Sequence, residues 1–217
     1  MRYILLILAL AATAALGADS PVKTADDASK GSQFFNGKDL EGWEGVKEYW
    51  SVKDGAIVGY TPKDPGYNNF LCSKKKYGDF ELSFKVRLKD GVGNSGVQIR
   101  SRLLNPEKYI VGGPQADIGQ GFWGSLYGEQ FGGMMKQSPG ELVKKVVKQN
   151  DFNDYSIKCV GKHVTIKING ETMVDDDFDK MPNEGIIAWQ LHAGFKSMEV
   201  TFKDIEFKDL SKASEKK

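Results

Sequence analysis

The sequence predicts an all-β fold, specifically an antiparallel β-sandwich or jelly roll. Short runs that alternate apolar and polar residues recur along the chain at intervals of about 8–12 residues, which is the spacing of strands in such folds. Turn-forming pairs such as Asn-Gly and Asp-Gly separate the runs, and only residues 139–150 place apolar residues at helical spacing. In a sandwich of this kind one sheet can curve, so that its outer face forms a groove open to a ligand.

The expected elements follow one another along the chain. A tight turn at Asn36-Gly37 between short strands comes first, and a hairpin of 50–53 and 56–60 then closes around Asp54-Gly55. The run 80–87 alternates throughout and is the clearest half-buried strand, whereas 122–135 is too irregular for a helix or a long strand. The remaining strands are expected at 70–73, 155–160, 164–168, 171–174, 185–192 and 198–210, with one or two helical turns within 139–150.

Three stretches of predicted strand carry polar side chains on the face opposite their apolar residues. Successive side chains of a strand point to opposite faces, so residues two apart share a face. If the three strands neighbour one another in a sheet, their polar faces form one polar surface. The residues on these faces are Gln98, Arg100 and Arg102 in the first strand, Gln115 and Asp117 in the second, and Gln190 and His192 in the third.

We expect one domain, spanning residues 33–210. Residues 1–18 have a positive start at Arg2, an apolar stretch and small residues at their end, which is typical of a secretory signal peptide and too short for a membrane span. Residues 19–32 lack periodicity and are expected to be a disordered leader, and 211–217 a frayed tail. The protein is therefore expected to be secreted or periplasmic.

The charge balance gives no sign of an anionic partner. The chain has 30 Lys and Arg against 29 Asp and Glu, and Arg2 is the one charged residue of the expected signal peptide, so the remaining residues are balanced. Neither nucleic acid nor an anionic membrane surface is expected as a partner, and no protein partner is indicated. Cys72 and Cys159 are the only cysteines, and the sequence leaves open whether they form a disulfide or are buried free thiols.

Several segments together resemble a known family. FNGKDLEGW, NSGVQIRS, QADIG, GSLYGE, INGE and GIIAWQLHAG occur as an ordered set, over nearly the whole of 33–210, that resembles the 3-keto-disaccharide hydrolase domain family. The resemblance implies a concanavalin A-like jelly roll and cleavage of glycosides whose sugar ring carries a ketone at carbon 3. Phe152 departs from the tryptophan that is usual in the family before Asn-Asp-Tyr, and we interpret this as a packing change.

The expected reaction follows from a missing motif. Glycosidases of similar fold that retain configuration place E-x-D-x-E on one strand, whereas residues 115–119 read Gln-Ala-Asp-Ile-Gly and keep only Asp117. Ordinary retaining hydrolysis is therefore not expected. In a 3-keto glycoside the ketone acidifies the hydrogen on carbon 2, and the enolate formed there can expel the aglycone from carbon 1. That route requires a base, an acid and a donor to the ketone oxygen.

We expect Asp117, His192 and Glu129 to supply the catalytic base and acid, with Arg100 as the donor to the enolate. The first three would also make a workable ligand set for a divalent metal such as calcium, and the cofactor is left open. The acidic run 175–179 is a weaker candidate for calcium. Each catalytic candidate has a structural alternative, which for Arg100 is a cross-strand ion pair, for instance with Asp117.

Two kinds of side chain are expected to bind the substrate: glutamines that suit sugar hydroxyls, and aromatic residues that suit stacking on a pyranose ring. The main alternative to an enzyme is a non-catalytic, lectin-like domain that binds carbohydrate in the same groove. The expected binding residues are Gln98, Gln115, Gln190, Trp123, Tyr127 and Tyr109.

Overall fold

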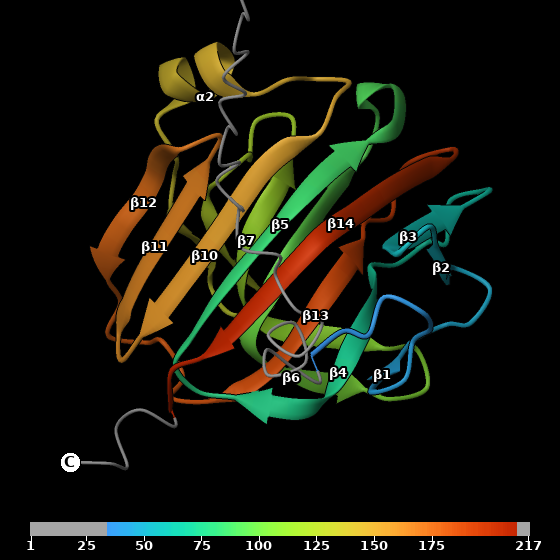
Figure 1. The fold of residues 1–217 in the computed structure, drawn as a ribbon, viewed down its shortest axis with the longest axis horizontal. Helices are drawn as coiled ribbons and strands as arrows, with labels where there is room; N and C mark the ends of the chain where they lie inside the picture. The colour runs from blue at the N-terminus through green and yellow to red at the C-terminus, as the bar shows by residue number, and fades with distance from the viewer. Residues whose placement is uncertain (1–33, 212–217) are drawn as a thin grey trace, which may run out of the picture. The chain divides into compact units, whose positions relative to one another are not determined.

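Two antiparallel sheets of seven strands each pack face to face in a computed structural model that describes residues 34–211 (Figure 1). The predicted all-β jelly-roll sandwich is confirmed. The signal peptide expected at 1–18, the leader expected at 19–32 and nearly all of the tail expected at 211–217 lie outside the described residues.

The first sheet, sheet A, holds all three stretches with a predicted polar face, in three adjacent strands. Its central strands β13, β6 and β7 are hydrogen-bonded neighbours, as the polar surface requires. The strand order is β1 (Trp43–Glu44), β4 (Asn69–Tyr77), β13 (Gly185–Leu191), β6 (Asn94–Asn105), β7 (Ile110–Gly119), β8 (Leu126–Glu129) and β9 (Gly133–Lys136).

The second sheet, sheet B, crosses the front of the view in Figure 1. The predicted hairpins are present, and a short helix, α2 (Gly140–Val146), lies within 139–150 as expected. The strand order is β12 (Glu171–Asp177), β11 (His163–Ile168), β10 (Asn153–Val160), β5 (Phe80–Leu88), β14 (Met198–Asp209), β3 (Ala56–Thr61) and β2 (Trp50–Lys53), and a 3-10 turn, η1 (Lys89–Gly91), follows β5.

The expectation of short strands on both sides of Asn36-Gly37 is wrong. The Asn36 side chain accepts hydrogen bonds from the backbone nitrogens of Lys38 (2.8 Å) and Asp39 (3.0 Å), and this local turn is followed only by the two-residue strand β1. Asparagine side chains compete in this way with strand pairing.

The core lies between the two sheets and is built from the alternating apolar faces that the sequence predicts. In β5 every second residue from Phe80 to Leu88 is buried, which is the pattern of a strand with one face in the core. The Trp189 ring of sheet A packs against Phe84 (5.2 Å between centroids) and Phe202 (4.5 Å) of sheet B. These contacts fix the inner face of β13, and with it the direction of Gln190 on the opposite face.

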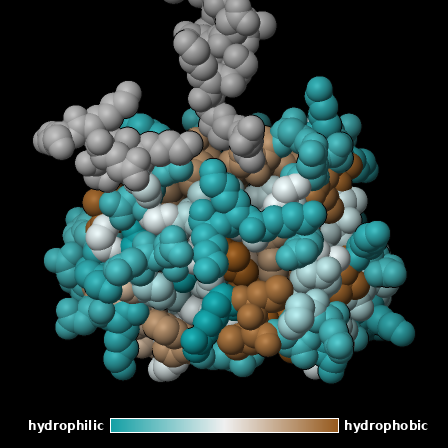
Figure 2. All heavy atoms as spheres, turned by 90° about the horizontal axis from the view of Figure 1, so that it is seen from below, coloured by the Kyte–Doolittle hydropathy of each residue, from teal (hydrophilic) through white to brown (hydrophobic). Residues whose placement is uncertain are grey.

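Hydrophilic and hydrophobic side chains are unevenly distributed on the face seen in Figure 2. Figure 2 shows one face on which hydrophilic side chains predominate and hydrophobic ones gather near the middle. Across residues 34–211, no helix combines the length and the apolar character that a membrane crossing requires.

A β-bulge in β6 interrupts the predicted alternation. Gln98 faces Gln115 and Arg102 faces Gly112, so four residues of β6 span three of β7. Arg100 lies in the extra stretch with a φ of 47°, a backbone conformation that is uncommon outside glycine. Because one residue is inserted, the side chain of Arg100 does not share the face of Gln98.

Candidate functional site

A polar pocket of about 290 Å³ opens on the outer face of sheet A. Ala116 and Ile118 of β7 point into the core, so Gln115 and Asp117 between and beside them point outward. The volume lies near the lower end of the range of about 300–1,000 Å³ that is typical of small-molecule sites. The residues that line the pocket are Asn68, Asn94, Gln115, Asp117, Phe122, Tyr127, Glu129 and His192.

Asp117 is the buried carboxyl group of this pocket, with only 3% of its surface exposed. Its Oδ1 accepts a hydrogen bond of 2.6 Å from Gln115 Nε2, and its backbone carbonyl accepts one of 3.0 Å from the Tyr155 hydroxyl. Burial raises the pKa of Asp117 to about 7, and the charge of Glu129 adds to the rise while the bond from Gln115 opposes it. A carboxyl group with this pKa can exchange a proton near neutral pH.

His192 follows the end of β13, and hydrogen bonds position both its backbone and its ring. Its backbone nitrogen donates to Asn94 O (3.3 Å), and its Nδ1 lies 2.6 Å from Ala193 O. A carbonyl oxygen only accepts, so we assign the hydrogen of the neutral ring to Nδ1. This tautomer leaves Nε2 as the nitrogen with a free lone pair, which is the form that a general base requires.

Asn68 joins three segments at the rim of the pocket. Its Nδ2 donates to Glu129 Oε1 of β8 (3.2 Å), and its Oδ1 accepts from Ala193 N (2.9 Å), next to His192. The same residue therefore positions Glu129 and the backbone beside His192. The structure thus brings together five predicted site residues, Asp117, His192, Glu129, Gln115 and Tyr127; their roles stay predictions.

Arg100 does not belong to this pocket, and the expectation that it faces the substrate beside Asp117 is wrong. The β6 bulge turns its side chain between the sheets, where the residue is 1% exposed. Its ion-pair partner is Asp79, with 2.7 Å between Nη2 and Oδ1, rather than Asp117. The guanidinium also donates to the backbone carbonyls of Gly78, Gly161, Pro182 and Cys159.

Trp123 is buried in the core and cannot stack on a sugar, so this expectation is also wrong. The backbone nitrogens of Phe122 and Trp123 both donate to Gly119 O (2.9 Å each), forming a tight turn that directs the two side chains apart. Phe122, at 38% exposed, lines the pocket instead. Because both residues are aromatic and adjacent, their composition does not indicate which one the turn exposes.

The other predicted binding residues lie beneath or beside the pocket rather than in its lining. Gln98 and Gln190 have no solvent exposure, although they share the outer face of sheet A with Gln115 through a series of side-chain hydrogen bonds. Tyr109 packs against an apolar cluster that includes Phe70 and Val111. A sugar in the pocket would therefore contact none of these three directly.

Sequence reasoning missed Asn68 and Asn94. Asn68 lies in a turn-rich loop before β4, and Asn94 at the first position of β6, where periodicity carries no information on orientation. The expected ligand set of Asp117, Glu129 and His192 is not formed: within residues 34–211, no group of three His, Cys, Asp or Glu side chains is arranged to hold a metal ion. The same finding applies to the acidic run 175–179.

The two cysteines are separate free thiols. Cys72 belongs to the apolar cluster on the outer face of sheet A, whereas Cys159 lies in the core between the sheets. Burial raises the pKa of Cys72 to about 12 and that of Cys159 to about 11. Of the two possibilities that the sequence left open, the structure shows the unbridged one.

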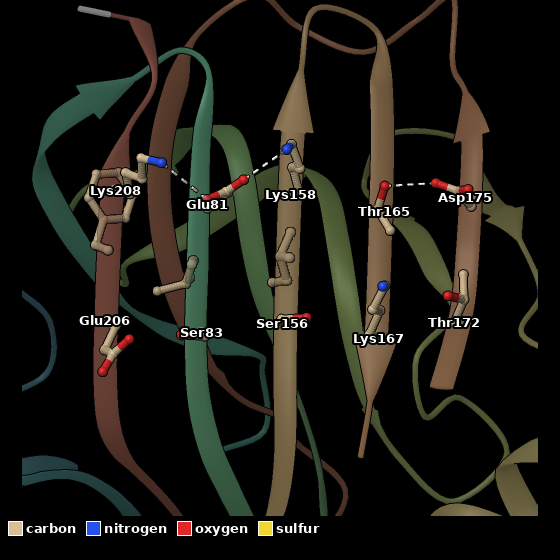
Figure 3. A pocket seen from close by; sticks show the side chains of 13 residues that line it. Glu81, Ser83, Ser156, Lys158, Thr165, Lys167, Thr172, Asp175, Glu206 and Lys208 are labelled. Carbon is tan, nitrogen blue, oxygen red and sulfur yellow. Dashed lines mark hydrogen bonds and ion pairs between the residues drawn. The ribbon is translucent and has the colours of Figure 1, made fainter. Parts of the chain in front are cut away.

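A larger hollow, of about 650 Å³, lies on the outer face of sheet B (Figure 3). Its outward side chains are mainly serine, threonine and charged residues, and exposed ion pairs cross its upper part, such as Glu81 with Lys158 at 2.8 Å. The small side chains Ser83 and Ser156, opposite each other in the sheet, form its floor. This is the alternating polar face of a solvated sheet, without the buried carboxyl group that distinguishes the pocket on sheet A.

The fold and the pocket together define a jelly-roll domain of the kind found in carbohydrate-active proteins. The chain belongs to the 3-keto-alpha-glucoside-1,2-lyase-like domain family, whose model matches residues 31–208. This match confirms the resemblance inferred from the ordered motifs.

Solved structures support the fold. A protein from Parabacteroides distasonis ATCC 8503, provisionally named a glycosyl hydrolase, is 20% identical with a TM-score of 0.61, covering 87% of this chain and 98% of its own. A second such protein from the same strain is 22% identical with a TM-score of 0.59, covering 80% and 96%. The carbohydrate-binding module CBM66 from Bacillus subtilis is 16% identical with a TM-score of 0.55, covering 77% and 95%. No curated protein matches the chain.

Proposed function

We propose that this protein is an enzyme that cleaves 3-keto glycosides by removing the proton on carbon 2 and eliminating the aglycone from carbon 1, in the pocket on sheet A. The observation that carries the proposal is the convergence of Asp117 and His192, from β7 and the end of β13, in one polar pocket. The family description, a 3-keto-alpha-glucoside-1,2-lyase-like domain, supports the same bond cleavage.

His192 is the base of the proposed reaction. The hydrogen bond from Nδ1 to Ala193 O orients the ring and leaves Nε2 able to accept the proton from carbon 2. The electron pair of the broken C–H bond moves toward the ketone oxygen, and the resulting enolate is the unstable species that the site must stabilise. With Arg100 buried elsewhere, the donors in the pocket that suit this oxygen are the Asn94 amide and the Tyr127 hydroxyl.

Asp117 is the acid. Because its pKa is raised to about 7, a substantial fraction of the carboxyl groups carries a proton near neutral pH. When the bond between carbon 1 and the aglycone oxygen breaks, the departing oxygen takes the proton of Asp117 and leaves as an alcohol. The sugar becomes an enone with a double bond between carbons 1 and 2, and water that adds to it gives the free 3-keto sugar. Burial is the main cause of the raised pKa of Asp117, and the charge of Glu129 adds to it.

The alternative is a carbohydrate-binding domain without catalysis, which the same pocket would also suit. The two functions are separated by incubating purified protein with a 3-keto disaccharide and with the unoxidised disaccharide, with and without chelator. The enzyme proposal predicts an enone or a free keto sugar from the first substrate only, and loss of turnover in Asp117→Asn. Binding of either sugar without turnover contradicts it, and turnover that stops with chelator adds a metal to the site.

We also propose that the protein is exported, on the sequence of residues 1–18. Mass spectrometry of the protein isolated from its native cells tests this: export predicts a mature N-terminus near residue 19 in the extracellular or periplasmic fraction. An intact Met1 or Arg2 on the bulk of the protein would contradict the proposal.

A further inference from the structure

A row of buried polar side chains on the outer face of sheet A runs toward Asp117. Ser101 Oγ donates to Gln98 Oε1 (2.6 Å), Gln98 Nε2 donates to Gln115 Oε1 (2.8 Å), and Gln115 Nε2 donates to Asp117 Oδ1 (2.6 Å). The first three of these residues are at most 4% exposed. Each glutamine accepts at its oxygen and donates at its nitrogen, so the amide dipoles point head to tail toward the carboxyl group.

The Gln115 side-chain amide, the last of this row, is held in one orientation by hydrogen bonds from both of its hydrogens. Gln115 Nε2 carries two hydrogens, and the second is donated to Gln190 Oε1 of β13 at 3.2 Å. Gln115 reaches β13 by lying across β6, the strand between them, at the position of Gly96. A Cβ at Gly96 would lie 2.6 Å from Gln115 Cδ and 2.7 Å from Nε2, closer than real Cβ atoms approach other heavy atoms. The glycine is needed there for space.

We propose that Ser101, Gln98 and Gln115 are positioning residues that orient the carboxyl group of Asp117 for proton transfer, and that Gly96 provides the space in which Gln115 does so. We call these three polar residues the glutamine relay. The inference rests on the proposed function for its catalytic meaning, whereas the effect of the relay on Asp117 is a property of the folded protein. Charge-assisted hydrogen bonds of this kind are stronger than neutral ones, and cooperative rows polarise one another.

The relay lowers the pKa of Asp117, whereas burial and the charge of Glu129 raise it. The titratable groups around this carboxyl group are Glu129 from β8, His192 from the end of β13 and Tyr155 from β10. A donor at Oδ1 stabilises the ionised form, against burial and against the charge of Glu129. Without the relay, Asp117 would hold its proton to higher pH and its carboxyl group would lose its fixed orientation.

The test is a carbon-13 NMR titration of the Asp117 carboxyl group in three variants, with no substrate present. Gln98→Met removes the donor to Gln115, and Gln98 is fully buried, does not itself line the pocket and makes no hydrogen bond to Asp117. Gly96→Ala removes no polar atom but displaces the Gln115 amide. Gln149→Met, at an exposed glutamine in the turn before β10, is the matched control.

We expect the pKa of Asp117 to rise by about one unit in Gln98→Met and in Gly96→Ala, because a hydrogen bond to a charged group is weakened, and to stay unchanged in Gln149→Met. The pH profile of kcat should move in the same direction with the 3-keto disaccharide. An unchanged pKa of Asp117 in folded Gln98→Met, or an equal rise in Gln149→Met, would overturn the relay. If Gly96→Ala does not fold, Gln98→Met decides. A protein inactive on the sugar but with the expected titrations would refute the proposed function and leave the relay standing.

Discussion

Replacing Arg100 by methionine tests whether this residue has a structural or a catalytic role. The guanidinium pairs with Asp79 and donates to four backbone carbonyls, which lie in the turn before β5, at the end of β10, in the turn between β10 and β11, and in the loop before β13. Methionine fills much of the same volume but satisfies none of these acceptors. Removing one partner of a buried ion pair costs about 3–5 kcal/mol of the free energy of unfolding.

For a domain of this size, about 1 kcal/mol lowers Tm by about 2–4 °C, so Arg100→Met should lower Tm by about 6–20 °C in a calorimetric scan. The Asp79 side chain is 35% exposed and can be rehydrated in part, which favours the lower half of that range. Arg102→Met is the matched control, because Arg102 lies on the same strand and is exposed. The turnover per folded molecule at 20 °C should match the wild type. An unchanged Tm with lost turnover would refute this reasoning and restore Arg100 to the active site.

Three further predictions concern other residues. The free energy of unfolding should fall between about pH 4 and pH 7, because the pKa of Asp117 is higher in the folded than in the unfolded protein, so the stability from its bound proton is lost as pH rises through about 7. In denaturant titrations, Asp117→Asn should remove this loss. A parallel pH dependence in both proteins would contradict the prediction. Trp123→Ala should lower the free energy of unfolding measured in urea by about 3–5 kcal/mol, because the side chain is buried in the core. Phe122→Ala should change stability little but raise KM, because this side chain lines the pocket. The opposite pattern would show that the turn exposes Trp123. Proton NMR should give His163 a raised pKa, caused first by its hydrogen bond to Asp175, and Asp175→Asn should lower it; no difference between the two proteins would refute the contact.

Most of the fold follows from local rules that a sequence displays. Two-residue alternation identifies strands such as β5 and β10, and the pairs Asp54-Gly55 and Asn169-Gly170 place the turns of the β2–β3 and β11–β12 hairpins, because these signals depend only on neighbouring residues. The same alternation correctly assigns Gln115 and Gln190 to the outer face of sheet A. Their direction could be predicted because β7 and β13 are both regular where these residues lie, whereas their closeness depends on a strand order that entered the prediction only as a condition.

The errors arise where one residue changes the direction of all that follow. The extra residue in β6 is set by pairing with distant strands, which local periodicity does not reveal, and it turns Arg100 from the predicted substrate face into the interior. In the same way, the turn at Gly119 buries Trp123 in the core and exposes Phe122 at the pocket, the reverse of the predicted binding role of Trp123. Asn68 lies in a loop whose position depends on contacts with two distant segments, so no pattern around it indicates a site.

The central claim is that the pocket removes the proton on carbon 2, and a turnover experiment in deuterium oxide tests it directly. The protein is mixed with a 3-keto disaccharide, and the early product is examined by NMR against a blank without protein. Elimination followed by hydration predicts deuterium on carbon 2 of the released keto sugar beyond the blank, and no product from His192→Ala. Product that retains hydrogen on carbon 2, or His192→Ala turning over at the wild-type rate, would contradict the account.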